Sequence, residues 1–189
     1  LDVDGLLKGI YLYSPAKASR KKNAQILASG VAVNWATKAQ ELLQKDWGVS
    51  ADVWSVTSWN ELRRDGLAVD RHNLLNPSSK KSAYLTDRMK DAQGPVIAVS
   101  DYMRTVQDQI APWIPQQFSS LGTDGFGLSD TRGALRRHFK VDAESIVVAT
   151  LAELAKAGEV KESVVQEAID KYRIFDVRSA DAGNTEGSG

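Results

Sequence analysis

The residues best placed to do chemistry follow apolar runs that read as buried strands. Asp101 comes directly after the run Pro95–Ser100, and Asp124 lies in a glycine-rich turn after Phe118–Gly122. Ligands of open α/β sheets bind beyond the carboxyl ends of the strands, so these two carboxylates can share one edge. Two interpretations stay open there. The pair acts as a general base or ligand-orienting pair, or the carboxylates cap helices and bond loops.

The glycine-rich stretch Leu121–Phe139 is predicted to hold a strand end, a turn and a helix start. Its glycines allow backbone angles that side chains disfavour, and Ser129 or Asp130 is predicted to cap the helix. A helix N-terminus behind glycines can bind an anion. However, the spacing is neither a dinucleotide fingerprint nor a phosphate loop, and residues 127–131 lack the second glycine of a nucleophile elbow.

The remaining polar motifs identify no catalytic centre. His72 has no second ligand at metal spacing, and His138 is interpreted as a surface residue among basic neighbours. The chain has no cysteine, which excludes thiol catalysis and disulfides. Arg132, Arg136 and Lys140 are four residues apart, which predicts one basic stripe on a helix. That stripe is either a solvated face or a subunit interface, where arginine is enriched.

Composition narrows the class of protein. The 189 residues suffice for one domain with a hydrophobic core, and the zero net charge argues against a nucleic-acid or anionic-membrane partner. No apolar run reaches membrane-spanning length, and no signal segment opens the chain. Because the chain starts at Leu1, a piece of a longer protein is expected, with a processed terminus as the alternative. The basic loop Lys17–Asn23 is interpreted as a solvated turn. The alternative is a site where an acidic patch of a partner docks.

Apolar periodicity predicts alternating strands and helices. Strands are expected at Leu6–Tyr13 (an edge strand), Gln25–Ser29, Asp52–Val56, Pro95–Ser100 and Phe118–Gly122. Seven helices are expected, over 35–48, 58–66, 67–75, 82–89, 103–110, 146–155 and 164–172. The first is expected to end at Gly48, the second to begin with a capping box at Ser58, and the sixth to have Asp142 as its cap. This alternation predicts one three-layer α/β/α domain over residues 1–178, with about five mostly parallel strands. A flexible tail is expected over 179–189.

Six phrases of the sequence resemble one known family. They are DGLLKGIYLY, QILASG, DVWSVTSWNELRRDG, VIAVSDYM, LGTDGFGLSDTRGALRRHFKVD and VVATLAELAKAGE. In this order, from about Asp4 to about Ile174, they resemble the C-terminal domain of the bacterial homodimeric pyruvate dehydrogenase decarboxylating component. That protein belongs to the transketolase-like family of thiamine diphosphate enzymes. GTDGFGLSDTR followed by RRHF is specific for this subgroup.

The resemblance implies a full-length cytoplasmic bacterial enzyme of three α/β domains. It implies decarboxylation of pyruvate and reductive acetylation of a lipoyl group on a dihydrolipoyl acyltransferase core. Thiamine diphosphate and magnesium are implied to bind between the first two domains, through a GDG…N motif and an activating glutamate. The present chain contains no GDG motif. The resemblance therefore carries over no catalytic, cofactor-binding or metal-binding residue, and the chain alone is expected to be inactive.

A supporting role is implied instead, in which this domain packs against its own second domain and helps to form the homodimer, with its own N-terminal and middle domains as partners. The candidate interface residues are Asp101, Tyr102, Asp124, Phe126, Ser129, Asp130, Arg132 and Arg136. Two alternatives stay open. One is a docking platform for the acyltransferase core through Lys17–Lys22 or the Arg132–Lys140 stripe. The other is an independent α/β ligand-binding domain that uses Asp101 and Asp124.

Overall fold

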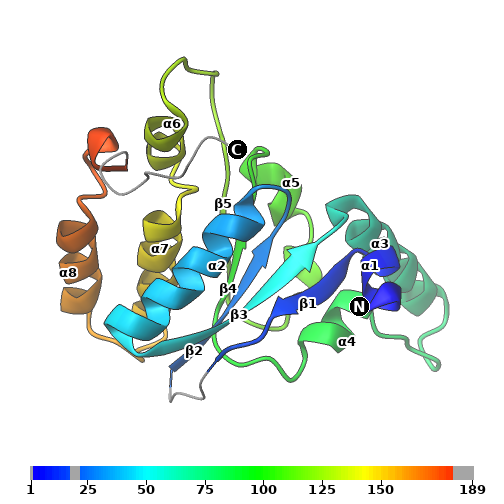
Figure 1. Cartoon of the computed structure of the whole chain (residues 1–189). Coiled ribbons are helices and arrows are strands. Elements are labelled where there is room, and N and C mark those ends of the chain that lie inside the picture. Colours follow the sequence, from blue (N-terminus) through cyan, green and yellow to red (C-terminus); the bar gives the residue numbers. More distant parts are fainter. Residues whose placement is uncertain (1, 18–21, 181–189) are drawn as a thin grey trace.

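The chain folds around one five-stranded sheet with helices on both faces (Figure 1). The computed structural model describes residues 2–17 and 22–180. The strands are β1 (Ile10–Ser14), β2 (Lys22–Ala28), β3 (Val49–Val56), β4 (Val96–Val99) and β5 (Phe118–Leu121), and their spatial order is β1-β3-β2-β4-β5. Only β1 is antiparallel to its neighbour. The predicted mostly parallel α/β fold is confirmed.

The helices pack in two layers. The α-helices are α1 (Val3–Lys8), α2 (Ala32–Leu42), α3 (Trp59–Leu75), α4 (Tyr84–Met89), α5 (Arg104–Asp108), α6 (Arg132–His138), α7 (Ala143–Lys156) and α8 (Glu162–Tyr172). Shorter turns are η1 (Leu43–Trp47), η2 (Ala111–Trp113) and η3 (Val177–Ala180). Side chains alternate along a strand, so Ile26 packs into the cluster under α2 and α7, whereas Leu27 packs into the cluster under α3 and α4.

The predicted strand Leu6–Tyr13 begins inside a helix. Residues 3–8 form α1, because the Asp2 carboxylate caps it by accepting from the Gly5 N–H at 2.8 Å. Gly9 ends α1 at φ 105°, a left-handed angle that glycine adopts readily. The strand begins only at Ile10 and lies at the sheet edge, as predicted. The pattern suggested a longer strand because strand and helix signals overlap in short apolar segments.

Gly66 does not end a helix, which corrects the predicted break between two short helices. Helix α3 runs continuously from Trp59 to Leu75 and stops before Pro77, as expected. A Cβ atom at Gly66 would lie 2.3 Å from ring atoms of Trp113. Glycine is therefore present because an indole ring packs directly on the helix backbone.

Two of the predicted helix caps are confirmed. The Ser58 hydroxyl accepts from the Glu61 N–H at 3.1 Å, and the Asp142 carboxylate accepts from the Ser145 N–H at 3.0 Å. The capping box at Ser58 is only half formed, because the Ser58 N–H donates to the Gly9 carbonyl instead. Gly48 ends the second helical region at φ 64°, as predicted.

The predicted tail begins inside ordered structure. Ser179 and Ala180 belong to η3, and the Ser179 hydroxyl donates to the Asp176 carbonyl at 2.7 Å. Residues 181–189 lie outside the described part of the chain, as does most of the basic loop after Lys17.

Candidate interface at the carboxyl ends of the strands

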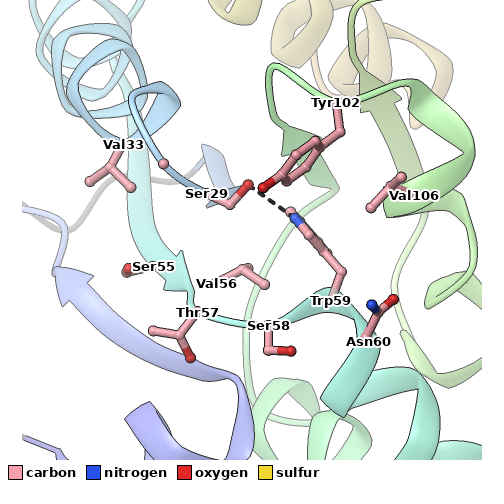
Figure 2. A pocket seen from close by; sticks show the side chains of 11 residues that line it. Ser29, Val33, Ser55, Val56, Thr57, Ser58, Trp59, Asn60, Tyr102 and Val106 are labelled. Atoms are coloured by element: carbon pink, nitrogen blue, oxygen red, sulfur yellow. Dashed lines mark hydrogen bonds between the residues drawn. The ribbon is translucent and has the colours of Figure 1, made fainter.

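A crevice of about 710 Å³ lies at the carboxyl ends of β2 and β3, beside the loop that follows β4 (Figure 2). The chain passes from β2 to β3 on one side and then crosses to β4 on the other. This switch point is where open α/β sheets bind ligands, and the volume lies within the range of about 300–1,000 Å³ of small-molecule sites. Among the described residues, however, no Lys, Arg, Asp, Glu or His lines it.

The hydroxyl groups in and beside the crevice are bonded to one another and to the protein. Trp59 Nε1 donates to Ser29 Oγ at 3.0 Å, and Ser29 Oγ shares a 2.8 Å hydrogen bond with Ser100 Oγ. Figure 2 shows the Tyr102 ring turned toward Trp59 and Ser29. No histidine or carboxylate of the described chain hydrogen-bonds to either serine. Among the described residues, neither serine is therefore paired with a base that could activate it as a nucleophile.

The two carboxylates predicted at this edge differ in position. Asp124 Oδ1 accepts from the Arg104 N–H at 2.9 Å, which is the loop-bonding interpretation. The Asp101 side chain lines a separate small groove, and its backbone carbonyl accepts from Thr123 Oγ1 at 2.6 Å. The loop after β4, which carries Asp101 and Tyr102, meets the loop after β5 at Gly122. A Cβ atom at Gly122 would lie 2.5 Å from the Tyr102 carbonyl oxygen. These contacts fasten the loop after β4 to the loop after β5.

The loop from Gly122 to Asp130, here called the arm, stands out beyond α6 at the top of Figure 1. Its aromatic residue Phe126 is 94% exposed. Gly125 has φ 95°, and a Cβ atom there would meet no atom within 4 Å. The cap of the following helix is Thr131, whose hydroxyl accepts from the Ala134 N–H at 3.2 Å, so the predicted cap at Ser129 or Asp130 is wrong.

Large apolar side chains gather on the loops after three strands. Exposed residues on these loops are Val31 after β2, Tyr102 and Met103 after β4, and Phe126 and Leu128 after β5. Because parallel strands end at the same edge, the loops share one side of the molecule. Exposed apolar surface that exceeds scattered single residues marks contact sites. The candidate residues Tyr102 and Phe126 therefore both lie exposed at this edge of the sheet.

The predicted basic stripe is shorter than expected. Arg132 and Arg136 form no ion pair within the described part of the chain, and the Arg136 guanidinium lies 4.4 Å from the Trp35 ring centroid. Lys140 leaves the stripe because α6 ends at His138 and Lys140 has φ 60°. Its Nζ donates to the carbonyls of Arg137 and Ile174, each at 3.0 Å. Burial lowers the pKa of Lys140, although the Asp142 carboxylate opposes this shift.

Sequence reasoning missed Arg137, which is only 2% exposed and holds α6 in place. Its guanidinium pairs with the carboxylates of Asp142 and Glu144 and donates to the Tyr172 carbonyl at 2.9 Å. It also donates to Ser179 Oγ at 2.7 Å. The sequence did carry a signal. Ala134, three positions earlier on the same helix, is apolar and buried, which places Arg137 on the inner face of the helix.

The described residues do not fit a thiamine diphosphate and magnesium site. No group of three His, Cys, Asp or Glu side chains in the described ranges can hold a metal ion. His72 Nε2 lies 2.9 Å from the Ser79 carbonyl oxygen, and the His138 ring packs edge-on against Phe139. Magnesium with a diphosphate needs oxygen ligands, chiefly carboxylates, and the described carboxylates form no cluster of three metal ligands.

No helix within the described ranges is long and apolar enough to cross a membrane.

Comparisons with known proteins agree with this geometry. The family model of the Transketolase-like TK C-terminal domain matches residues 9–142. The "Pyruvate dehydrogenase E1 component" of Mycolicibacterium smegmatis is 56% identical over 181 residues, which are 95% of this chain and 20% of that protein. The component of Escherichia coli K12 is 44% identical over 173 residues, 90% of this chain and 19% of that protein. The chain thus spans about a fifth of these relatives.

Solved structures share the fold at low sequence identity. Transketolase from Leishmania mexicana gives a TM-score of 0.53 at 18% identity, over 82% of this chain and 19% of that one. A split-gene transketolase, an inactive beta4 tetramer, gives 0.54 at 17% identity, over 78% of this chain and 43% of that one. With its parallel sheet and the matching family model, the chain belongs to the transketolase-like C-terminal domain family.

Proposed function

We propose that this chain is a non-catalytic scaffold domain of a bacterial, cytoplasmic pyruvate dehydrogenase E1 component. In the longer protein, the other domains bind thiamine diphosphate and magnesium, decarboxylate pyruvate and acetylate the lipoyl group of the acyltransferase core. The relatives support this identity, because each is an E1 component of which this chain spans about a fifth. The chain itself contributes surfaces that hold protein neighbours.

One observation supports the scaffold role above all. The edge of the sheet where an α/β enzyme keeps its ligand carries exposed apolar side chains, and the described residues of its crevice include no ionisable acid, base or cation other than a tyrosine. Stable interfaces within obligate assemblies are apolar, whereas catalytic sites concentrate titratable groups. A role for Tyr102, Phe126 and Arg132 in contacts with another domain or with the second subunit follows from this contrast.

The test uses the longer polypeptide with Phe126→Ala and Arg132→Ala. We expect weaker dimerisation or weaker docking of this domain, measured by sedimentation and by protease resistance of the linker, with turnover per assembled dimer retained. Phe175→Ala is the matched control, because Phe175 is also an exposed aromatic residue (83%) but lies after α8. An unchanged dimer combined with a selective loss of pyruvate decarboxylation would contradict the proposal.

A docking platform for the acyltransferase core is the second candidate. The observation in its favour is that Arg132 and Arg136 form no ion pair with the described residues. Lys17 is a weaker candidate, since its Nζ already lies 3.3 Å from a Glu41 carboxylate oxygen. A pull-down with the core's subunit-binding domain, repeated at high salt, tests this role, because exposed charge pairs are screened. Salt-insensitive capture, or none, would rule out charge-driven docking.

A further inference from the structure

A second hollow of about 210 Å³ lies between the start of α2 and the outer face of α6. Its walls are mostly apolar and include Val31, Trp35, Leu135, Phe139 and Val141. A cavity of about 150 Å³ with such walls accommodates one benzene ring, whereas drug-sized ligands need about 300 Å³ or more. This hollow, here called the α2–α6 groove, therefore fits a single aromatic side chain and is too small for a cofactor.

The same side of the molecule carries an aromatic side chain without a binding partner. Phe126 is the most exposed large apolar residue of the described chain, at 94%, so it does not fill its own groove. It stands on the arm between Gly125 and Gly127, and a Cβ atom added at either glycine would meet nothing within 4 Å. Nothing in the described chain therefore obstructs the approach of another molecule to this ring.

The side chains around the arm and the groove carry charges of both signs, and four of these charged groups form no ion pair within the described ranges. Asp101 lines the groove and Asp130 ends the arm, and neither carboxylate forms an ion pair within the described ranges. The same holds for the guanidinium groups of Arg132 and Arg136. A surface with an aromatic projection, a hollow of matching size and charges of both signs is complementary to itself. Self-complementary patches pair two identical chains about a two-fold axis.

We propose that Phe126 of one copy inserts into the α2–α6 groove of a second copy, and that the contact is reciprocal. Acidic groups of one copy face the α6 guanidinium groups of the other around the inserted rings. This inference rests on the proposed function, because it assigns the second subunit as the partner of the arm. It goes further in naming the side chain that each copy contributes and the hollow that receives it.

Cysteine cross-linking tests the contact cleanly, because the chain has no native cysteine. One copy carries Leu128→Cys, at an exposed arm position that leaves the Phe126 ring in place, and a second, differently tagged copy carries Val31→Cys, at an exposed position on the groove rim. A disulfide needs Cβ atoms about 3.5–4.5 Å apart, so mild oxidation joins the two copies only if the arm reaches the groove. Phe175→Cys mixed with Val31→Cys is the matched control and should give no product above collision background.

Self-association supplies an independent measurement. In sedimentation equilibrium, Phe126→Ala should weaken association about tenfold or more, as truncation of a central aromatic anchor does, and Phe175→Ala should not change it. Absence of the 128–31 cross-link above the control overturns the inference. If Phe126→Ala still loosens domain docking in the longer polypeptide, the proposed function stands without it. If docking is also unchanged, both fail.

Discussion

The segment Leu121–Phe139 contains two regions with opposite properties. In its second half, Arg137 is buried and its guanidinium contacts two carboxylates, two backbone carbonyls and a hydroxyl. In its first half, the arm holds Phe126 in solvent, and Arg132 follows without an ion pair in the described chain. Phe126 and Arg137 are only eleven positions apart in the sequence.

The comparison separates what holds the domain together from what it offers to neighbours. A buried charge is tolerated only when its hydrogen bonds are satisfied, so Arg137 serves the fold of this chain. An exposed aromatic ring contributes little to the fold and gains its binding energy only against a partner. The fixed helix thus supports the free arm, and substitutions in the two halves should have different consequences.

The largest effect is expected from Arg137→Met. Removal of one partner from a buried ion pair leaves Asp142 and Glu144 with uncompensated charge, which costs about 3–5 kcal/mol. Urea unfolding monitored by circular dichroism measures this loss. Arg132→Met, at an exposed position of the same helix, is the control and should cost under about 0.5 kcal/mol. Equal stabilities for the two variants would contradict the distinction between a buried half that stabilises the fold and an exposed half that does not.

Gly66→Ala should destabilise the chain by about 1–3 kcal/mol through overpacking against Trp113. At an exposed helix position the same change stabilises by about 1 kcal/mol. The sign of the change in unfolding free energy therefore shows whether the Trp113 ring packs against position 66. The background Trp113→Leu removes the clash and should reduce the penalty. A stabilising Gly66→Ala substitution in the unaltered chain would show that the indole does not pack on this helix.

The cap of α6 gives a smaller effect at the junction of the two halves. Thr131→Ala should cost about 1 kcal/mol, because the Ala134 N–H loses its acceptor. Ser129→Ala, two residues earlier on the arm, should change the free energy of unfolding by less than about 0.5 kcal/mol. Denaturant midpoints of the two variants provide the measurement, and a larger loss at Ser129 would restore the cap that the sequence suggested.

A pH-dependent effect is expected far from the arm, at Asp46. Burial alone would raise the pKa of this carboxyl, but hydrogen bonds from Lys171 and Tyr172 outweigh it and lower the pKa below its usual 3.8. A lowered pKa in the folded state adds stability above about pH 4, and this stability is lost as the pH falls further. Asp46→Asn should therefore flatten the acid limb of a stability profile between about pH 5 and pH 2. An unchanged slope would show that Asp46 does not contribute to the acid sensitivity of the fold.

The smallest effect on folding is expected at Phe126. Phe126→Ala should leave the free energy of unfolding of this chain within about 0.5 kcal/mol, because the ring contacts solvent. Its effect should be confined to association. Parallel unfolding and sedimentation measurements on one sample separate the two, and a marked loss of stability in the dilute monomer would mean that the ring packs on its own chain.

Much of the fold followed from local physics. The run Val96–Val99 is buried on every residue, as a central parallel strand must be, and the caps at Ser58 and Asp142 formed where their side chains can reach free N–H groups. The errors at residues 6–9 and at Gly66 have different causes. At residues 6–9, the strand and helix signals of a short apolar segment overlap, and the local Asp2 cap decides for the helix. At Gly66, the helix depends on a tertiary partner, the Trp113 ring, that periodicity does not encode.

The candidate site was predictable in place but not in detail. Strand ends located the carboxyl edge, and GTDGFGLSDTR located the arm, yet only the fold shows Asp124 bonded to a neighbouring loop. Arg137 was overlooked because charged residues are almost always exposed, and its partners Tyr172 and Ser179 are more than thirty residues away along the chain.

The most direct test of the scaffold role is a calorimetric titration of this chain with thiamine diphosphate in the presence of magnesium. We expect only heats of dilution, since no cluster of three metal-ligating side chains occurs among the described residues. Saturable binding near one equivalent per chain would contradict the scaffold role, because the domain would then hold the cofactor that we assign to the rest of the enzyme.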